Sequence, residues 1–185
     1  MSSDSDSDCD TYSNGKIIIV GDGGVGKTTY IDRITTLKFN PKYTATLGVD
    51  VRPVRFTTNC GKLLFNVWDC AGQEKFLGLD DEYYIGAVGC IIMFDGTNSF
   101  KNVVNWYNKV RNIRKTIPIV ICHNIKNTEQ FNTISNDNVV NVKINVKSCL
   151  NIDEPFMYLA SSIMNREVHQ VGEQSFKSIE SNEEQ

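Results

Sequence analysis

The residues from Gly21 to Thr28 have the types and spacing that most clearly predict chemistry. They read GDGGVGKT, the pattern G-x-x-x-x-G-K-T, and they directly follow the β-branched run at residues 17–20. Glycines let the backbone turn around a phosphate and point successive N–H groups at its oxygens, beside a helix N-terminus that favours anions. In this pattern Lys27 reaches the outer phosphates and the Thr28 hydroxyl binds Mg²⁺. The sequence therefore predicts a loop that holds a nucleoside triphosphate, and we call residues 21–28 the phosphate loop.

A second group of residues predicts how the metal and an attacking water would be held. Asp69 follows a strand predicted at residues 62–68, where a Walker-B carboxylate that holds Mg²⁺ through water belongs. Gly72 leaves room for its backbone N–H to touch the terminal phosphate, and Gln73 can orient a water in line with it. Thr46 would give Mg²⁺ a second hydroxyl only while the last phosphate is present. Hydrolysis would then release both loops, which predicts a switch.

Hydrophobic periodicity predicts the elements that position these groups. Strands are expected at residues 17–20, 49–57, 62–68, 88–94, 117–122 and 139–146, and helices at 28–37, 98–114 and 152–164, with a short helix toward Tyr84. Asn98 or Ser99 would cap the second of these helices. Pro53 and a hairpin turn at residues 59–61 place the second strand at an antiparallel edge. We therefore predict an α/β fold with a six-stranded, mostly parallel sheet, helices on both faces, and ligands beyond the carboxyl ends of the strands.

Composition bounds the domain organisation and the partners. Residues 1–13, which contain SDSDSD, are expected to form a disordered acidic tail, residues 14–166 a single domain, and residues 167–185 a polar tail. A net charge of −3 without a basic patch predicts no binding to nucleic acid. Six scattered cysteines suit reduced thiols in the cytoplasm or nucleus better than a disulfide framework or a zinc site.

The chain resembles the Ras-superfamily small GTPases, and within them it is most similar to the Ran subfamily of nuclear transport. The segments GDGGVGKTT, KYTATLGV, FNVWDCAGQEKF, EYYI, CIIMFD and NVVNW carry the resemblance in the same order, and it extends over residues 16–164. It implies a P-loop NTPase G domain that binds GTP or GDP with Mg²⁺ and hydrolyses GTP slowly without an activating protein. Ran-type exchange factors, GTPase-activating proteins and effectors are the implied partners of a monomer.

The resemblance also implies the residues of the site. Phe39 would stack on the base edge, Tyr43 would lie near the terminal phosphate, and Gln73 would be the catalytic residue. The metal would be held by Thr28, Thr46 and, through water, Asp69. The full set of nucleotide-binding residues is Asp22, Gly23, Gly24, Val25, Gly26, Lys27, Thr28, Thr29, Phe39, Tyr43, Thr46, Gly72, Asn124, Asn127, Asn145, Val146 and Lys147.

The segments that would read the base depart from the family pattern. Where the family has N-K-x-D, this chain has N-I-K-N, and only Lys147 remains of the family's S-A-K element. Asn127 offers guanine one acceptor and one donor where aspartate offers two acceptors. An unmet charge-assisted pair costs about 2–4 kcal/mol, or roughly 30- to 1000-fold in affinity. Xanthine would suit Asn127 better and adenine could accept from it; alternatively, contacts elsewhere keep GTP bound at its high cellular concentration.

Three functions are consistent with these residues. The first is a Ran-like GTPase switch in nucleocytoplasmic transport, which Gln73 favours. The others are a low-turnover Ran mimic that occupies transport or regulatory factors, and a triphosphatase with relaxed or altered base specificity, which the base-reading segments favour. Residues 128–141 contain no lysine or arginine, so binding to import receptors through a basic surface there is not expected. The chain ends in Glu184-Gln185 without a prenylation box, so we expect no membrane anchor.

Overall fold

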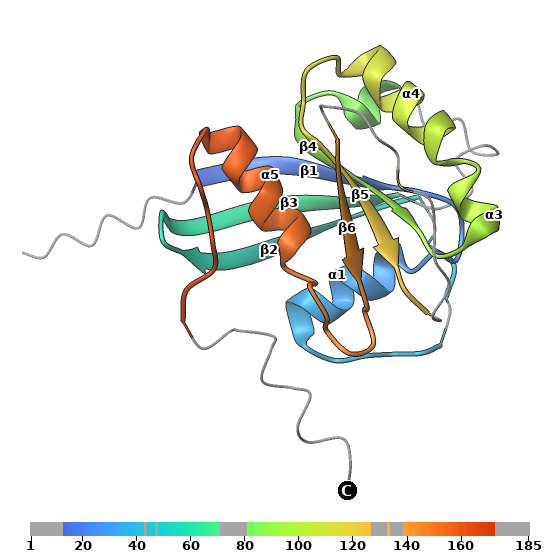
Figure 1. Cartoon of the computed structure of the whole chain (residues 1–185), viewed down its shortest axis with the longest axis horizontal. Coiled ribbons are helices and arrows are strands. Elements are labelled where there is room, and N and C mark those ends of the chain that lie inside the picture. Colours follow the sequence, from blue (N-terminus) through green and yellow to red (C-terminus); the bar gives the residue numbers. More distant parts are fainter. Residues whose placement is uncertain are drawn as a thin grey trace, which may run out of the picture.

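The computed structural model describes residues 13–42, 44–46, 48–70, 81–126, 133 and 139–172. Within these residues, six strands form one sheet in the order β2-β3-β1-β4-β5-β6 (Figure 1). The strands are β1 (Ser13–Val20), β2 (Val49–Thr58), β3 (Gly61–Cys70), β4 (Ala87–Phe94), β5 (Ile119–Asn124) and β6 (Val139–Ile144). Among the pairings between these six strands, only β2–β3 is antiparallel. The predicted mostly parallel sheet with one antiparallel edge strand is confirmed.

Helices cover both faces of the sheet, as predicted. One face packs against α1 (Lys27–Thr36) and α5 (Glu154–Met164), through Tyr30 and Phe156 among others. The other face packs against the 3₁₀ helix η1 (Asp81–Tyr84) and α4 (Val103–Ile113), through Tyr84 and Trp106. A short helix, α3 (Thr97–Phe100), leads into α4. No helix among the described residues is long and apolar enough to cross a membrane.

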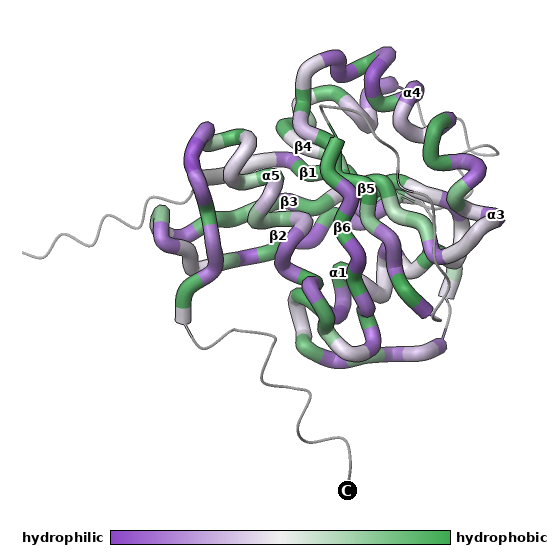
Figure 2. The backbone as a smooth tube through the Cα atoms, viewed as in Figure 1, coloured by the Kyte–Doolittle hydropathy of each residue, from purple (hydrophilic) through white to green (hydrophobic). Residues whose placement is uncertain are grey.

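Strand β1 lies at the centre of the sheet and divides its side chains between the two faces. Ile17 and Ile19 belong to the cluster under α1 and α5, whereas Ile18 and Val20 belong to the cluster under α4, and all four are fully buried. This alternation is the period of two that a strand imposes. Figure 2 shows the hydrophobic residues concentrated along the central strands. Burial of each such side chain stabilises the fold by about 1.5–3 kcal/mol, which anchors the strand that ends at the phosphate loop.

In the edge strand β2, the predicted alternation of buried and exposed residues holds only from Val54 onward. Pro53 pairs with Asn66 of β3 and lies on the outer edge of the sheet, where its missing N–H breaks no ladder. The buried face of β2 begins at Val54, and Val51 is exposed. After α5 the chain returns to this hairpin, where Asn59 N donates to His169 O over 3.1 Å.

The predicted continuous helix at residues 98–114 is wrong, because the chain turns between α3 and α4 at Lys101 and Asn102. The Asn102 amide donates to the Asp22 carboxylate over 2.6 Å, so a tertiary hydrogen bond holds the first turn of α4. Neither Asn98 nor Ser99 is an N-cap residue, since Gly96 is the N-cap of α3 and Asn102 that of α4, although Ser99 takes part in the capping box of α3. Ser99 lies inside α3, where its Oγ accepts from the backbone N–H of Asp95 and Gly96.

Candidate functional site

A cavity of about 370 Å³ opens at the carboxyl ends of the parallel strands. It is lined by the phosphate loop and α1, by the segment that follows α1, and by the residues that follow β5 and β6. Its volume lies within the range of roughly 300–1,000 Å³ typical of small-molecule sites. The topology alone predicts a ligand here, because open α/β sheets bind ligands beyond the carboxyl ends of their strands.

Two glycines of the phosphate loop are required by close contacts. A Cβ atom on Gly21 would lie 2.1 Å from the backbone oxygen of Met93 in β4. Gly26 has φ +100°, and a Cβ there would lie 2.7 Å from the side-chain amide nitrogen of Asn124. The next residue begins α1, which has no side-chain hydrogen bond at its N-cap. The first N–H groups of α1 are therefore available to an anion such as phosphate.

Lys27 is held over the phosphate loop. Its side chain is buried, and Nζ donates to the carbonyl oxygens of Gly21 at 2.6 Å and Asp22 at 3.0 Å. Buried ammonium groups need such partners because desolvation penalises the charged form. The loop therefore fixes a positive charge in the lining of the cavity, where it would attract phosphate oxygens.

Three oxygen-bearing side chains converge beside Lys27. Thr28 Oγ1 lies 2.7 Å from Thr46 Oγ1 and 2.5 Å from Asp69 Oδ2, to which it donates. Asp69 is 1% exposed, and its Oδ1 has no hydrogen-bond partner within the described part of the chain. Burial raises the pKa of Asp69, while the hydrogen bond from Thr28 and the charge of Lys27 oppose that shift.

These oxygens fit Mg²⁺. Hydroxyl and carboxylate oxygens are the hard ligands that this ion prefers, and it commonly uses one or two carboxylates together with substrate phosphates. The open Oδ1 of Asp69 is a buried acceptor that a cation or its water would satisfy, and positive charge nearby would offset the cost of burying the carboxylate. Thr28, Thr46 and Asp69, the predicted metal-binding residues, thus lie together.

Asp22 belongs to the phosphate loop, but its side chain points away from the cavity. Its Oδ1 accepts from Trp106 Nε1 at 2.9 Å and its Oδ2 accepts from Asn102 Nδ2 at 2.6 Å. The negative charge is thereby turned toward α4 and away from the position that phosphates would take. Asp22 can therefore contribute its backbone to a bound nucleotide, and its carboxylate anchors the loop to α4.

Asn124 joins the loops at the other end of the cavity. Its Nδ2 donates to Val25 O at 3.0 Å, and its Oδ1 accepts from Val146 N at 3.4 Å. The side chain is buried, so both halves of the amide are used to brace the phosphate loop against the loop after β6. Asn124, a predicted site residue, thus braces the loops after β5 and β6 at this end of the cavity, which we call the base end.

Lys126 was not among the predicted site residues. Its Nζ donates to Gly24 O of the phosphate loop at 3.2 Å and to Asp95 Oδ2 at 2.5 Å, while Ile125 lines the cavity. One signal in the sequence could have revealed it, since the lysine stands one position beyond the family's N-K-x-D lysine. Lys126 therefore places a cation in the lining of the cavity, next to the phosphate loop and one position later in the chain than in the family pattern.

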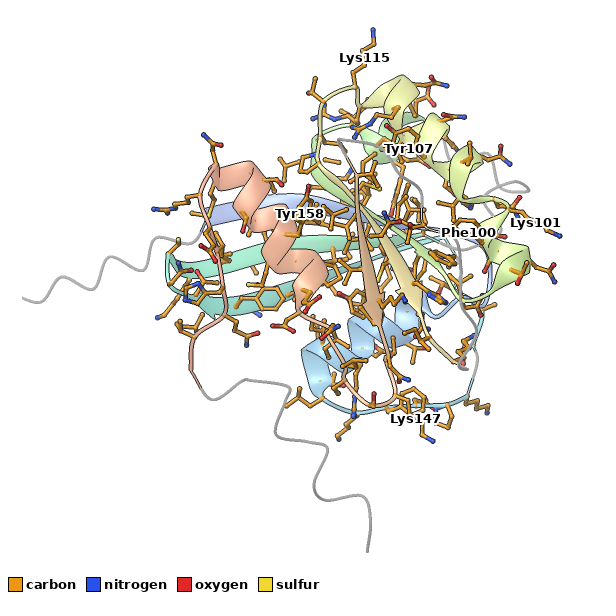
Figure 3. The ribbon with its side chains drawn as sticks, viewed as in Figure 1. Phe100, Lys101, Tyr107, Lys115, Lys147 and Tyr158 are labelled. Carbon is orange, nitrogen blue, oxygen red and sulfur yellow. The ribbon has the colours of Figure 1, made fainter. Side chains whose placement is uncertain are left out.

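The structure brings most of the predicted nucleotide-binding residues to one cavity. Those that line it are Gly24, Gly26, Lys27, Thr28, Thr29, Phe39, Thr46, Asn124, Asn145, Val146 and Lys147. Figure 3 labels Lys147 in the loop after β6. Gly23 and Val25 do not line the cavity, although Val25 O accepts from Asn124. The predicted roles of Tyr43, Gly72, Gln73 and Asn127 fall outside the described residues.

The sequence also matches a known protein family over more than half of its length. Residues 16–127 match the family described as the Ras of Complex, or Roc, domain of DAPkinase. The match begins in β1 and includes the phosphate loop, Asp69 and Asn124, the residues that the structure gathers around the cavity. The chain therefore belongs to the Roc family, whose members are GTP-binding, switch-like domains of the Ras superfamily.

Proposed function

We propose that the protein is a Mg²⁺-dependent switch that binds GTP and GDP and hydrolyses GTP. The observation that carries this proposal is the convergence of Thr28, Thr46 and the open Oδ1 of Asp69 beside the buried Lys27. Lys27 and the N–H groups at the start of α1 would hold the phosphates, and the three oxygen-bearing side chains would hold the ion. Bound Mg²⁺ would neutralise charge on the outer phosphates.

In this proposal, Thr46 is the residue that responds to the presence of the last phosphate. Among the described residues between α1 and β2, Phe39 and Thr46 are partly buried and the others are exposed. The contact between Thr46 and Thr28 thus ties an otherwise exposed segment to the metal position. Loss of the last phosphate would weaken that contact, and the segment would be released. Gly72 and Gln73 keep their proposed roles of contacting that phosphate and orienting the water.

Hydrolysis by nucleotide-stripped protein tests this proposal directly. With Mg²⁺ and one equivalent of GTP, we expect bound GTP to be converted to GDP and phosphate in a single turnover, and a Gln73→Leu variant to release far less phosphate. The low-turnover mimic predicts that wild type and variant release equally little. Failure of the wild-type protein to bind any purine nucleotide at millimolar concentration would overturn the proposal.

A second candidate is a triphosphatase with relaxed base choice, and the base end of the cavity favours it. Ile125 lines the cavity, and the amide of Asn124 is engaged by Val25 and Val146. Asn127, which the family pattern assigns to guanine, would offer the base one acceptor where aspartate offers two. Affinities for GTP, XTP and ATP distinguish the two candidates. A guanine-specific enzyme should prefer GTP by at least about a hundredfold, and Asn127→Asp should tighten GTP at least about tenfold only if Asn127 faces the base.

We further propose Ran-type regulation in nucleocytoplasmic transport, supported by the order of the sequence segments that resemble Ran. Faster release of GDP with a Ran-type exchange factor than with a factor for another Ras-superfamily branch would support this proposal. Equal release with both factors would contradict it. A complex that forms without turnover would favour the mimic.

A further inference from the structure

Arg33 lies on α1 with only 4% of its surface exposed. Among the described residues, no carboxylate lies within ion-pair distance of it. A buried guanidinium is costly unless its N–H groups find acceptors, so its contacts indicate why the fold keeps it.

The guanidinium of Arg33 joins two distant segments of the chain. Its Nη1 donates to Leu37 O at 2.5 Å, at the end of α1. Its Nε donates to Cys149 Sγ at 2.8 Å, and its Nη2 donates to Lys147 O at 3.2 Å, both in the loop after β6. The planar fork of arginine can make three such bonds at once, which lysine cannot reproduce.

Each end of this bridge is a turn in an uncommon backbone conformation. Leu37 has φ 60° and Cys149 has φ 62°, both in the left-handed region that side chains other than glycine rarely adopt. Left-handed residues persist where the surrounding structure fixes them. Arg33 contacts both residues directly and is therefore placed to fix both turns.

Both turns lead into the walls of the base end of the cavity. Leu37 precedes Phe39, which lines the cavity. Cys149 follows Asn145, Val146 and Lys147, which also line it. Arg33 itself does not line the cavity.

We propose that Arg33 is a positioning residue that fixes the distance between these two walls and thereby sets how long a nucleotide stays bound. The inference rests on the nucleotide binding proposed above and concerns the base end of that site. The phosphate end, held by Lys27 and the start of α1, does not depend on this bridge.

The experiment uses the full chain with Mg²⁺, fluorescent GDP and inorganic pyrophosphate. Arg33→Gln removes the charge and most of the bridge, Arg33→Lys keeps the charge, and Cys149→Ala removes the thiol acceptor alone. Arg55→Gln, on the exposed side of β2, is the matched control. The free energy of unfolding of each nucleotide-free variant shows whether it folds.

We expect GDP to dissociate about tenfold faster from Arg33→Gln, at an intermediate rate from Arg33→Lys, and about threefold faster from Cys149→Ala. The affinity of Arg33→Gln for pyrophosphate should stay within about twofold of wild type, because that probe contacts only the phosphate end. Arg55→Gln should match wild type.

The outcomes separate this inference from the function on which it rests. If wild type binds no GDP, the proposed function fails. If wild type binds GDP and a folded Arg33→Gln releases it at the wild-type rate, the Arg33 inference is overturned. Equal weakening of GDP and pyrophosphate would also overturn it, since the role would then be a general one in folding. If Arg33→Gln does not fold, unchanged release from both Arg33→Lys and Cys149→Ala is the overturning result.

Discussion

The indole of Trp106 donates a hydrogen bond of 2.9 Å to the carboxylate of Asp22 and so joins α4 to the phosphate loop. With Asn102 on the other carboxylate oxygen, α4 holds a negative charge away from the position of the phosphates. A carboxylate free to rotate in this loop would repel a triphosphate. The surface helix α4 and the nucleotide site are therefore mechanically connected, although α4 does not line the cavity.

Removal of the indole donor tests this connection. Trp106→Phe keeps an aromatic ring but leaves one oxygen of Asp22 without its partner, so we expect the free energy of unfolding to fall by about 1–3 kcal/mol. GTP affinity should fall with it, because Asp22 gains freedom to face the phosphates. Urea unfolding and equilibrium titration with GTP measure the two effects.

Val104→Ala, at an exposed position of the same helix, is the control and should change neither quantity. Asn102→Asp should be worse than Trp106→Phe, because it replaces an amide donor with a second carboxylate beside Asp22. If Trp106→Phe and Asn102→Asp both bound GTP with wild-type affinity, the proposed link between α4 and the nucleotide site would be contradicted.

Thr46→Val tests the metal position and the switch together. The change keeps the size of the side chain and removes the hydroxyl that lies 2.7 Å from Thr28 Oγ1. We expect GTP affinity in Mg²⁺ to fall about tenfold and GDP affinity to change by less than about twofold, since Thr46 joins the ion only with the last phosphate. Removal of Mg²⁺ with a chelator should abolish the difference between variant and wild type.

Thr57→Val, at an exposed position of β2 that does not line the cavity, serves as the control for Thr46→Val. An equal loss of GTP and GDP affinity in Thr46→Val would place Thr46 in general binding and rule out its proposed role in sensing the phosphate.

Lys126→Met tests how much the Lys126 cation contributes to nucleotide binding. Lys126 is exposed, and its ion pair with Asp95 should contribute no more than about 1 kcal/mol to the free energy of unfolding. Nucleotide affinity should fall by about three- to tenfold, because Nζ also holds Gly24 O of the phosphate loop. Equilibrium titration at low and high salt measures this, and the loss should shrink at high salt.

Asp95→Asn removes the charge that pairs with Lys126, while its amide oxygen can still accept from Ser99 Oγ. It should cost less affinity than Lys126→Met. If Asp95→Asn lost more nucleotide affinity than Lys126→Met, the ion pair with Asp95, and not the bond to Gly24, would account for the contribution of Lys126 to binding. Lys101→Met, in the exposed turn between α3 and α4, is the matched control.

The parts of the site that the sequence predicts are those encoded by local pattern. The phosphate loop and Asp69 each follow a β-branched or apolar run, so topology brings them to one edge of the sheet. The sheet itself follows from the alternation of strand and helix periods.

Three features depend on tertiary contacts that no local pattern encodes. The turn between α3 and α4 depends on Asn102 meeting Asp22, 80 residues away in the sequence. Arg33 reads as a polar position on α1, and only the fold shows that it is buried against Cys149. Leu37 completes the apolar spacing of that helix, yet it is the left-handed C-cap and is half exposed, because the chain must turn there toward Phe39.

His123 predicts how stability depends on pH. It is a buried residue of β5, and its ring stacks on Phe94 with the ring centroids 4.6 Å apart. Burial, assisted by the charge of Lys143 and opposed by Asp95, lowers the pKa of His123 below the ordinary value of 6.5. The folded state therefore disfavours the protonated ring. Below about pH 6.5 the unfolded chain binds the proton more readily, so the free energy of unfolding should fall as pH decreases, by at most about 1.4 kcal/mol per pH unit from this residue.

His123→Phe isolates this contribution, because it keeps a ring to stack on Phe94 and removes the titrating nitrogens. Urea unfolding of wild type and variant between about pH 5 and 7.5 should give curves that run parallel above the ordinary histidine pKa and diverge below it, with the wild type losing more stability. Parallel curves for wild type and His123→Phe over the whole range would show that the fold accommodates a charged His123, against the lowered pKa argued from its burial.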